Sequence, residues 1–374
     1  MIIGVPKEIK NLEYRVGLTP SSVRELIDHG HTVLVQKNAA AEIGFDDRCY
    51  LEAGARIVAS AQKVFAEAEM IVKVKEPQPR ECAMLREGQI LFTYLHLAPD
   101  PLQTQGLIKS GCTAIAYETV TDEFGGLPLL APMSEVAGRM SIQAGAHALE
   151  MARGGRGTLL GGVPGVAPAK VTIIGGGVVG SNAARMAIGL GAETLILDRS
   201  VHRLQYLDDL FQGRVRVEYS TATAIETHVL GSDLVIGAVL IPGAAAPKLV
   251  TREMVRRMPR GSVLVDVAID QGGCFETSRA TTHEHPTYKV DEVVHYCVAN
   301  MPGAVARTST LALNNSTLPY SIALADYGIE ALLRQPHLRH GLNVHQGKVT
   351  YQAVSKAQNL DYVPAEDALR RSAT

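Results

Sequence analysis

Three glycines mark the part of the chain whose residue types best suit phosphate binding. Gly175, Gly177 and Gly180 follow the β-branched run 171–174 directly and open a helical stretch at Val178. In this context the first glycine permits a tight turn, the second lets a phosphate approach the backbone, and the third lets helix and strand pack closely. The free N–H groups at the start of the helix favour a diphosphate. The spacing therefore predicts a dinucleotide site.

An acidic residue at the end of the next predicted strand bears on which dinucleotide binds. Asp198 follows the run 194–197, about 20 residues beyond the glycines, where a carboxylate usually binds the ribose hydroxyls. A carboxylate at this place repels a 2′-phosphate, which favours NAD over NADP. Arg199 comes next in the chain, and an arginine there could accommodate that phosphate, so NADP remains the alternative.

Polar side chains also follow several other predicted strands, at the edge of a parallel sheet where ligands bind. The residues in such places are Arg15, Lys75, His96, Asp270 and Asn300. A guanidinium for a carboxylate, a cation for a carbonyl oxygen and an imidazole for proton transfer are what a dehydrogenase of a small carboxylate needs. Lys73 shares a strand face with Lys75, and the pattern alone does not choose between the two lysines.

These residues depend on a regular alternation of strands and helices, which predicts parallel sheets covered on both faces. The predicted strands are 2–5, 32–36, 70–75, 89–95 and 113–118, then 170–174, 194–197, 215–219, 233–239, 262–268 and 293–299. The predicted helices are 20–29, 100–110, 134–153 and 319–333, with others starting at Val178, at about His202 and at Thr251.

The second series of strands looks complete, so the helical tail from about Val305 needs a partner elsewhere. We therefore predict an α/β fold with two doubly wound domains. A Rossmann NAD domain at 131–304 is inserted in a discontinuous substrate domain made of 1–130 and 305–374.

The composition is that of an ordinary soluble protein. A chain of 374 residues suggests two domains, and a net charge of −2 provides no basic field for nucleic acid or an anionic membrane. The five cysteines are scattered without a C-x-x-C pair, which argues against a zinc site and fits a reducing compartment. No signal peptide or membrane-length apolar run is evident, so we expect a cytoplasmic protein without metal.

Several motifs together resemble the alanine dehydrogenase and pyridine nucleotide transhydrogenase family, and the similarity covers nearly the whole chain. The matching segments are 3–8, 14–20, 72–77, 93–98, 166–192, 266–273 and 300–305. The resemblance implies reversible, NAD-dependent oxidative deamination of L-alanine to pyruvate and ammonium. It also implies a homohexamer and domain closure over the substrate.

Carried over by motif, the resemblance assigns roles to the residues already singled out. It implies that Arg15 pairs with the substrate carboxylate and that Lys75 polarises the carbonyl oxygen. It makes His96 the acid/base and Asp270 the residue that orients substrate or water. For NAD it implies contacts from Ser134, Gly175, Gly177, Val178, Val179, Gly180, Asp198, Arg203, Ser220, Val239, Leu240, Val267, Ala268, Ile269, Asp270, Arg279, Val298, Asn300 and Met301.

Three other functions fit parts of the pattern. The first is the NAD-binding component of a proton-translocating transhydrogenase, which typically carries an insertion in the second domain and an acid other than aspartate at the position of Asp270. This sequence lacks such an insertion around 238–243. The second is an amino-acid dehydrogenase for a larger substrate. The third is an NADH-binding regulatory protein with a decayed site, against which the set Arg15, Lys75, His96 and Asp270 argues.

Overall fold

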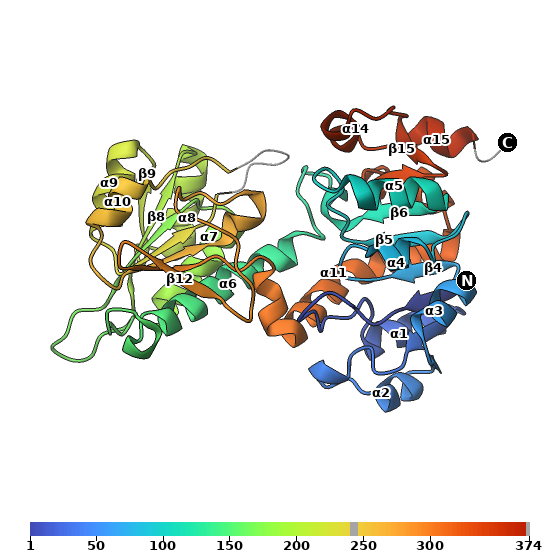
Figure 1. Ribbon diagram of the computed structural model, residues 1–374, viewed down its shortest axis with the longest axis horizontal. Helices are drawn as coiled ribbons and strands as arrows, with labels where there is room; N and C mark the ends of the chain where they lie inside the picture. The colour runs from blue at the N-terminus through green and yellow to red at the C-terminus, as the bar shows by residue number, and fades with distance from the viewer. Residues whose placement is uncertain (240–245, 372–374) are drawn as a thin grey trace. The chain divides into compact units, whose positions relative to one another are not determined.

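The chain forms two compact units, one of which interrupts the other along the sequence (Figure 1). The computed structural model describes residues 1–239 and 246–371. Unit 1 consists of Met1–Met133 and Val305–Thr374, and unit 2 of Ser134–Ala304. The division at 133 falls inside α6 (Ala131–Ala148), close to the expected boundary at 130, and the division at 304 coincides with the expected one.

Unit 1 is built on a sheet whose first six strands are parallel. Its strand order is β15-β14-β6-β5-β4-β1-β2-β3, so the chain order reverses between β1 and β4. The strands are β1 Ile2–Val5, β2 Thr32–Gln36, β3 Arg56–Val58, β4 Met70–Val72, β5 Ile90–Thr93, β6 Thr113–Ala116, β14 Leu342–His345 and β15 Lys348–Val349.

The helices of unit 1 include the long α11, which packs on α1 after the chain returns from unit 2. They are α1 Pro20–Asp28, α2 Asp47–Glu52, α3 Ala61–Glu67, α4 Pro79–Cys82, α5 Pro101–Ser110, α11 Ala306–Tyr327, α12 Glu330–Arg334, α13 Pro336–Arg339, α14 Gln352–Gln358 and α15 Ala365–Arg371. The predicted start of α1 is confirmed: the Thr19 hydroxyl accepts from Ser22 N, Pro20 takes the first position, and Gly30 follows with φ 85°.

Unit 2 carries the same reversal of strand order. Its sheet runs β12-β13-β11-β10-β7-β8-β9, and the reversal lies between β7 and β10. The strands are β7 Lys170–Ile174, β8 Glu193–Asp198, β9 Arg216–Tyr219, β10 Leu234–Gly237, β11 Val263–Asp266, β12 Thr287–Val290 and β13 Val293–Tyr296. Its helices are α7 Val178–Gly189, α8 Val201–Phe211, α9 Ala222–Leu230 and α10 Arg252–Arg257, with most of α6.

Two predicted helices have wrong bounds. The helix predicted at 134–153 begins at Ala131 and ends at Ala148, and only a 3₁₀ turn covers Met151–Arg153. The helix predicted to begin at Pro319 is instead the second half of α11, which passes through this proline. A proline removes one intrahelical hydrogen bond, and a helix held by buried neighbours such as Leu313 and Leu324 can tolerate that loss.

The sheets are not wholly parallel. β14 pairs antiparallel with β6 and with β15, and β12 pairs antiparallel with β13. These short strands, like β3, lack the long β-branched runs that identified the others. In Figure 1 the strand β15 and helix α14 lie beside α5 and β6, so the C-terminal tail extends the first sheet, as the predicted packing on the first domain requires.

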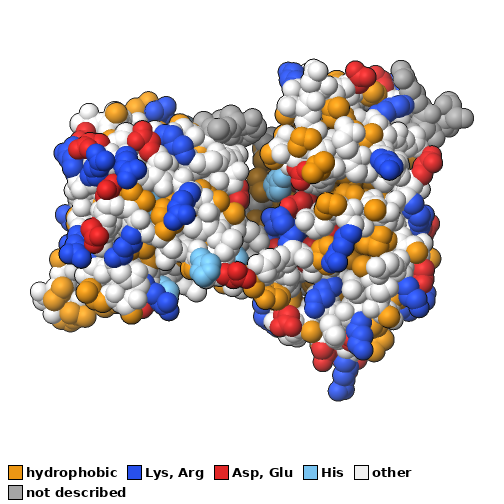
Figure 2. Space-filling model, viewed as in Figure 1, with side chains coloured by type: hydrophobic (Ala, Val, Ile, Leu, Met, Phe, Trp, Pro, Cys, Tyr) orange, Lys and Arg blue, Asp and Glu red, His pale blue; other side chains and the backbone are white. Residues whose placement is uncertain are grey.

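Each sheet has its own hydrophobic core, in which the strand residues are almost fully buried. Figure 2 shows basic and acidic side chains intermingled on one face of the molecule, in keeping with a net charge of −2. Within residues 1–239 and 246–371 no helix combines the length and apolarity that crossing a membrane requires.

Candidate active site

The predicted substrate residues of unit 1 all follow the carboxyl ends of parallel strands next to the reversal of strand order. Arg15 lies in the loop after β1, Lys75 follows β4, and His96 follows β5. Because the parallel strands end at one edge of the sheet, these three segments lie at the same edge. Gly17 allows the loop that carries Arg15 to pack directly against the end of β4, because a Cβ added there would lie only 2.4 Å from the Val72 carbonyl oxygen.

Arg15 is buried, with 2% of its surface exposed, and pairs with a neighbouring carboxylate. Its Nε and Nη2 atoms donate to the two oxygens of Glu13 at 2.7 and 2.6 Å, and Nη1 lies 3.3 Å from Met133 Sδ. Burial by itself would lower the pKa of the Arg15 guanidinium, but the hydrogen bonds and charge of Glu13 raise it. Glu13 thus keeps the guanidinium charged and fixes its plane.

His96 sits at a backbone position with φ 50°, which non-glycine residues rarely adopt. The Glu118 carboxylate holds this turn, since its Oε1 accepts from the N–H of His96 at 2.6 Å and lies 3.7 Å from Nδ1. Tyr94 stacks on the imidazole, with ring centroids 5.8 Å apart, and donates its hydroxyl to Leu129 O at 2.5 Å. Half of the His96 side chain remains exposed, so the ring is oriented and still accessible.

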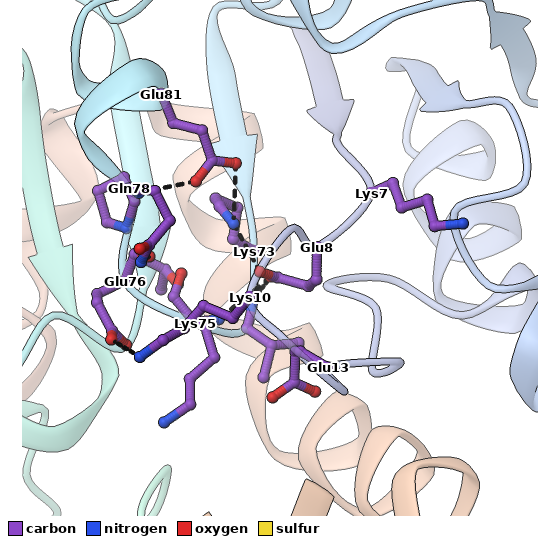
Figure 3. A network of polar contacts seen from close by, with 12 residues as sticks. Lys7, Glu8, Lys10, Glu13, Lys73, Lys75, Glu76, Gln78 and Glu81 are labelled. Carbon is purple, nitrogen blue, oxygen red and sulfur yellow. Dashed lines mark hydrogen bonds and ion pairs between the residues drawn. The ribbon is translucent and has the colours of Figure 1, made fainter. Parts of the chain in front are cut away.

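The structure separates the two lysines that the sequence left unresolved. Lys73 is 1% exposed, and its ammonium lies 2.7 Å from Glu8 and 3.2 Å from Glu81. Lys75 is half-buried, and Figure 3 shows it extending away from that trio. β4 ends at Val72, so the strand alternation that put both lysines on one face stops before either is reached. Lys73 therefore belongs to a buried ion cluster, whereas Lys75 is half-buried outside that cluster.

The glycine loop of unit 2 has the geometry that its spacing predicted. Gly175 has φ 101°, and a Cβ there would lie 2.6 Å from Ala238 O. A Cβ on Gly180 would lie 1.9 Å from Gly175 O, so this contact requires glycine. Apart from Gly177 and its two chain neighbours, no described atom lies within 4 Å of the Cβ position, and α7 starts there without a side-chain cap. A phosphate can therefore approach the first N–H groups of α7, from Val178 onward, which have no partner within the helix.

Asp198 ends β8 beside this loop. Its carboxylate accepts from Gly176 N at 2.7 Å and from Ser200 N at 2.8 Å, which ties the glycine turn to the start of α8. Arg203 donates from Nε to Gly176 O at 2.5 Å, and its guanidinium lies 4.6 Å from the Tyr206 ring centre. Both predicted residues therefore border the glycine loop, and Arg203 is anchored there.

Asp270 is exposed on a 3₁₀ turn, Val267–Gln271, that follows β11. The turn is organised by a different carboxylate, Asp266, which is fully buried. Asp266 accepts from Ala268 N at 3.1 Å, Cys274 N at 2.9 Å and the Ser278 hydroxyl at 2.5 Å. Burial raises the pKa of the Asp266 carboxyl, which these donors only partly offset.

The other predicted cofactor residues lie mainly beyond the carboxyl ends of the unit 2 strands. Those after β9, β10, β11 and β13 are Ser220, Val239, Val267, Ala268, Ile269, Val298, Asn300 and Met301. Asn300 has φ 73°, and its carbonyl oxygen lies 3.0 Å from His283 Nε2. Ser134 is on α6, and the Arg279 guanidinium stacks 4.1 Å from the Tyr288 ring centre. Leu240 lies outside the described residues.

Sequence reasoning missed four acidic residues that support these groups. Glu8, Glu13, Glu118 and Asp266 are each at least mostly buried and each hold a neighbouring site segment. For three of them the available signal was position, since Glu8, Glu118 and Asp266 lie at or just beyond the end of a parallel strand, whereas Glu13 lies farther along the loop after β1. Their targets are mainly backbone N–H groups, which no side-chain pattern reveals.

Two doubly wound α/β units, one with a dinucleotide loop and the other with clustered Arg, Lys and His at its switch point, define a class of two-domain, dinucleotide-binding protein. The family model described as alanine dehydrogenase/PNT, N-terminal domain, matches residues 4–137, and the model for the C-terminal domain matches residues 141–352. The chain belongs to the alanine dehydrogenase/PNT family.

Individual relatives show how far the similarity extends. A curated alanine dehydrogenase from Halomonas elongata is 64% identical over 366 residues, which cover 98% of this chain and 99% of that protein. A solved L-alanine dehydrogenase structure has a TM-score of 0.93 at 55% identity and covers 96% of this chain and 99% of its own. A solved transhydrogenase structure from Sinorhizobium meliloti has a TM-score of 0.80 at 26% identity. The match covers 94% of this chain and 100% of that chain.

Proposed function

We propose that this protein is an NAD-dependent dehydrogenase of L-alanine, which converts L-alanine, NAD and water reversibly to pyruvate, ammonium, NADH and a proton. High identity to curated alanine dehydrogenases over nearly the whole chain supports the reaction. The structural observation that carries the proposal is the grouping of Arg15, Lys75 and His96 at the ends of β1, β4 and β5.

The residues of unit 2 fit a dinucleotide. Gly177 leaves the approach to the α7 amides open, and Asp198 presents a carboxylate beside the loop. NAD, when bound, supplies the carrier that accepts hydride from the α-carbon of alanine. The Asp198 carboxylate favours the unphosphorylated ribose, so NAD is proposed in place of NADP.

Arg15 and Lys75 bind and polarise the substrate in this proposal. The guanidinium of Arg15, kept charged by Glu13, pairs with the carboxylate shared by alanine and pyruvate. The Lys75 ammonium stabilises the negative charge that develops on the oxygen of the carbonyl or carbinolamine. Lys73 cannot take this part while its ammonium is paired with Glu8 and Glu81.

His96 moves the protons. In deamination its imidazole can accept a proton from the attacking water, pass it to the amino group, and then accept the carbinolamine hydroxyl proton as ammonia leaves. In the reverse direction it returns a proton to the oxygen that leaves as water. Its stacking on Tyr94 and the support of Glu118 hold the ring in one orientation. Asp270, exposed on the turn after β11, orients water or ammonia in the same reaction.

The remaining cofactor contacts are proposed on the same basis. They come from Ser134, Val178, Val179, Arg203, Ser220, Val239, Leu240, Val267, Ala268, Ile269, Arg279, Val298, Asn300 and Met301, most of which border the carboxyl edge of the second sheet. We also propose a cytoplasmic homohexamer that takes no nucleic-acid or membrane partner and needs no metal.

The test is to mix the purified protein with NAD and L-alanine at alkaline pH and to follow the absorbance of NADH. NADH should form with alanine and should be consumed when pyruvate and ammonium are added. Formation with another amino acid alone would show that the substrate is wrong. Transfer between two nicotinamide nucleotides without any amino acid would favour the transhydrogenase component instead.

A further inference from the structure

The segment that carries Lys75 continues beyond the end of its strand and loses part of its backbone pairing there. β1 pairs with β4 only through Ile3 with Met70 and Gly4 with Ile71, and β1 ends at Val5, before Pro6. On the β5 side the pairing goes on, because Tyr94 N donates to Val74 O and the Thr93 hydroxyl donates to Lys75 O. The N–H groups of Val74 and Lys75 therefore need another acceptor.

Glu8 provides that acceptor from the loop after β1. Its Oε1 accepts from Val74 N at 2.7 Å and from Lys75 N at 3.2 Å. Its Oε2 accepts from the Lys73 ammonium at 2.7 Å. Glu8 exposes only 6% of its surface, so these contacts are shielded from water. One carboxylate thus takes the place of the missing strand partner.

The charges around Glu8 keep the carboxylate in this orientation. Figure 3 shows Lys73 between Glu8 and Glu81, and Glu81 is itself held by Gln78 N at 2.8 Å. Burial lowers the pKa of Lys73, but Glu8 and Glu81 outweigh it and raise that pKa. Burial raises the pKa of Glu81, and Lys73 only partly offsets this. Lys73 therefore stays charged, and its charge holds one oxygen of Glu8 while the other faces the backbone.

We propose that Glu8 is a positioning residue for Lys75: its carboxylate fixes the peptides of Val74 and Lys75, and buried Lys73 fixes the carboxylate. The inference rests on the proposed role of Lys75 in the alanine reaction. Glu8 itself touches neither substrate nor cofactor in this assignment. A displacement of about 1 Å of a catalytic group can lower the rate by about a hundredfold. Loss of the hydrogen bonds from Val74 N and Lys75 N to Glu8 should therefore lower the reaction rate.

The experiment compares three variants of the full chain. Glu8→Ala removes the carboxylate that accepts from the N–H groups of Val74 and Lys75. Glu8→Gln combined with Lys73→Met and Glu81→Gln keeps an amide oxygen for the two N–H groups and removes the ammonium together with the second carboxylate that it balances. Glu69→Gln is the matched control, because Glu69 Oε2 also accepts a backbone N–H, that of Ile2, and joins β1 to β4 at the opposite end.

The readouts are kcat and KM for pyruvate and ammonium, the affinity for NADH, and hydrogen exchange of a peptide that spans 73–76. Glu8→Ala should lower kcat/KM for pyruvate by about ten- to a hundredfold and speed exchange of that peptide, with NADH affinity unchanged. The triple variant should recover part of both effects, because the amide oxygen still accepts from the two N–H groups but Lys73 no longer fixes it. Glu69→Gln should match the wild type.

Normal kcat/KM in Glu8→Ala would overturn the proposal, and so would a triple variant as defective as Glu8→Ala. A parallel loss of NADH affinity would also overturn it, because it would indicate general unfolding. If the wild type shows no activity with alanine, the proposed function fails separately, and the exchange measurement still decides whether Glu8 holds the Lys75 segment.

Discussion

At the scale of single residues, the proposed site works through acids that orient its basic groups. Glu13 fixes Arg15, Glu118 fixes the His96 turn, and Glu8 fixes the Lys75 peptide. Each support is a carboxylate at the carboxyl edge of the sheet. A group that is held in one orientation loses little entropy when the substrate binds, which favours catalysis.

His96 offers the most direct test of the proposed chemistry. His96→Ala should lower kcat by about 100-fold or more, because it removes the acid/base that moves protons to and from the substrate oxygen. Steady-state kinetics in both directions measures the effect, and fluorescence titration should give an unchanged NADH affinity. Near-normal turnover in this variant would remove His96 from the mechanism.

The two lysines form a matched pair for a second prediction. Lys73→Met leaves Glu8 and Glu81 buried without their cation and should lower the free energy of unfolding by about 3–5 kcal/mol. Lys75→Met should change it by less than about 1 kcal/mol, since Lys75 is only half-buried, and should strongly reduce turnover. Urea denaturation and kinetics on both variants provide the comparison; a stable, active Lys73→Met would contradict the assignment.

At the scale of elements, the strand-to-helix turn between β7 and α7 uses its glycines for two different purposes. Gly180 lets α7 approach the loop, while Gly177 leaves space on the ligand side. The short turn after β11 depends in the same way on Asp266, which binds its backbone. These elements act as rigid supports for atoms that must meet a cofactor.

Alanine substitutions can separate the two uses. Gly180→Ala places a Cβ 1.9 Å from Gly175 O and should cost about 1–3 kcal/mol of folding stability as α7 shifts. Gly177→Ala meets no described atom and should change stability by less than about 0.5 kcal/mol. It should weaken NADH binding by about tenfold, or about 1.4 kcal/mol, because the methyl group lies where a phosphate approaches. Equal NADH affinity in Gly177→Ala and the wild type would argue against this site.

A buried histidine should make unit 2 sensitive to acid. Burial lowers the pKa of His295, on β13, to about 4, and its ring is satisfied by the Thr277 hydroxyl and Val293 O. Unfolded histidine titrates near 6.5. Between these values the unfolded chain binds a proton that the folded chain does not, so this part of the stability, present above about 6.5, is lost as the pH falls toward about 4.

The loss attributable to His295 should be about 3 kcal/mol over that range. Urea denaturation at several pH values measures it, and the variant His295→Gln should show a shallower dependence than the wild type. His147→Gln is the control, because His147 is exposed on α6 and its loss should leave the wild-type dependence in place. An unchanged slope in His295→Gln would contradict the prediction.

At the scale of the whole molecule, the two units repeat one strand order, and the chain leaves unit 1 and returns to it. Each unit has its own sheet and core. Residues far apart in sequence therefore stabilise the same segment: Asn314 of α11 accepts from Thr19 N at 2.8 Å, near the Arg15 loop. The returning tail thus supports the loop of unit 1 that carries Arg15.

The proposed assembly is open to measurement on the intact protein. Light scattering coupled to gel filtration should give a mass about six times that of one chain if the homohexamer is correct. The measurement should be repeated over a range of protein concentrations, since a closed assembly keeps its mass on dilution. A monomer or dimer at all concentrations would reject the hexamer without affecting the proposed reaction.

The sequence alone determined the features that depend on local pattern. The glycine spacing, the β-branched run before it and Asp198 predicted the dinucleotide loop, because each is a property of neighbouring residues. Most strands and the start of α1 were predictable for the same reason. The short strands β3, β12, β14 and β15 were not, since short strands of mixed composition form mainly through pairing with neighbouring strands.

Only the tertiary structure decided which side chains are available. The alternation of residues gave Lys73 and Lys75 the same status, and burial beside Glu8 and Glu81 distinguished them. Arg15 was predicted as a loop residue, but its burial and its pairing with Glu13 depend on a fold that encloses that loop. Burial, and charge pairs such as that of Lys73 with Glu8, act through space between segments far apart in the chain, so a linear pattern does not contain them.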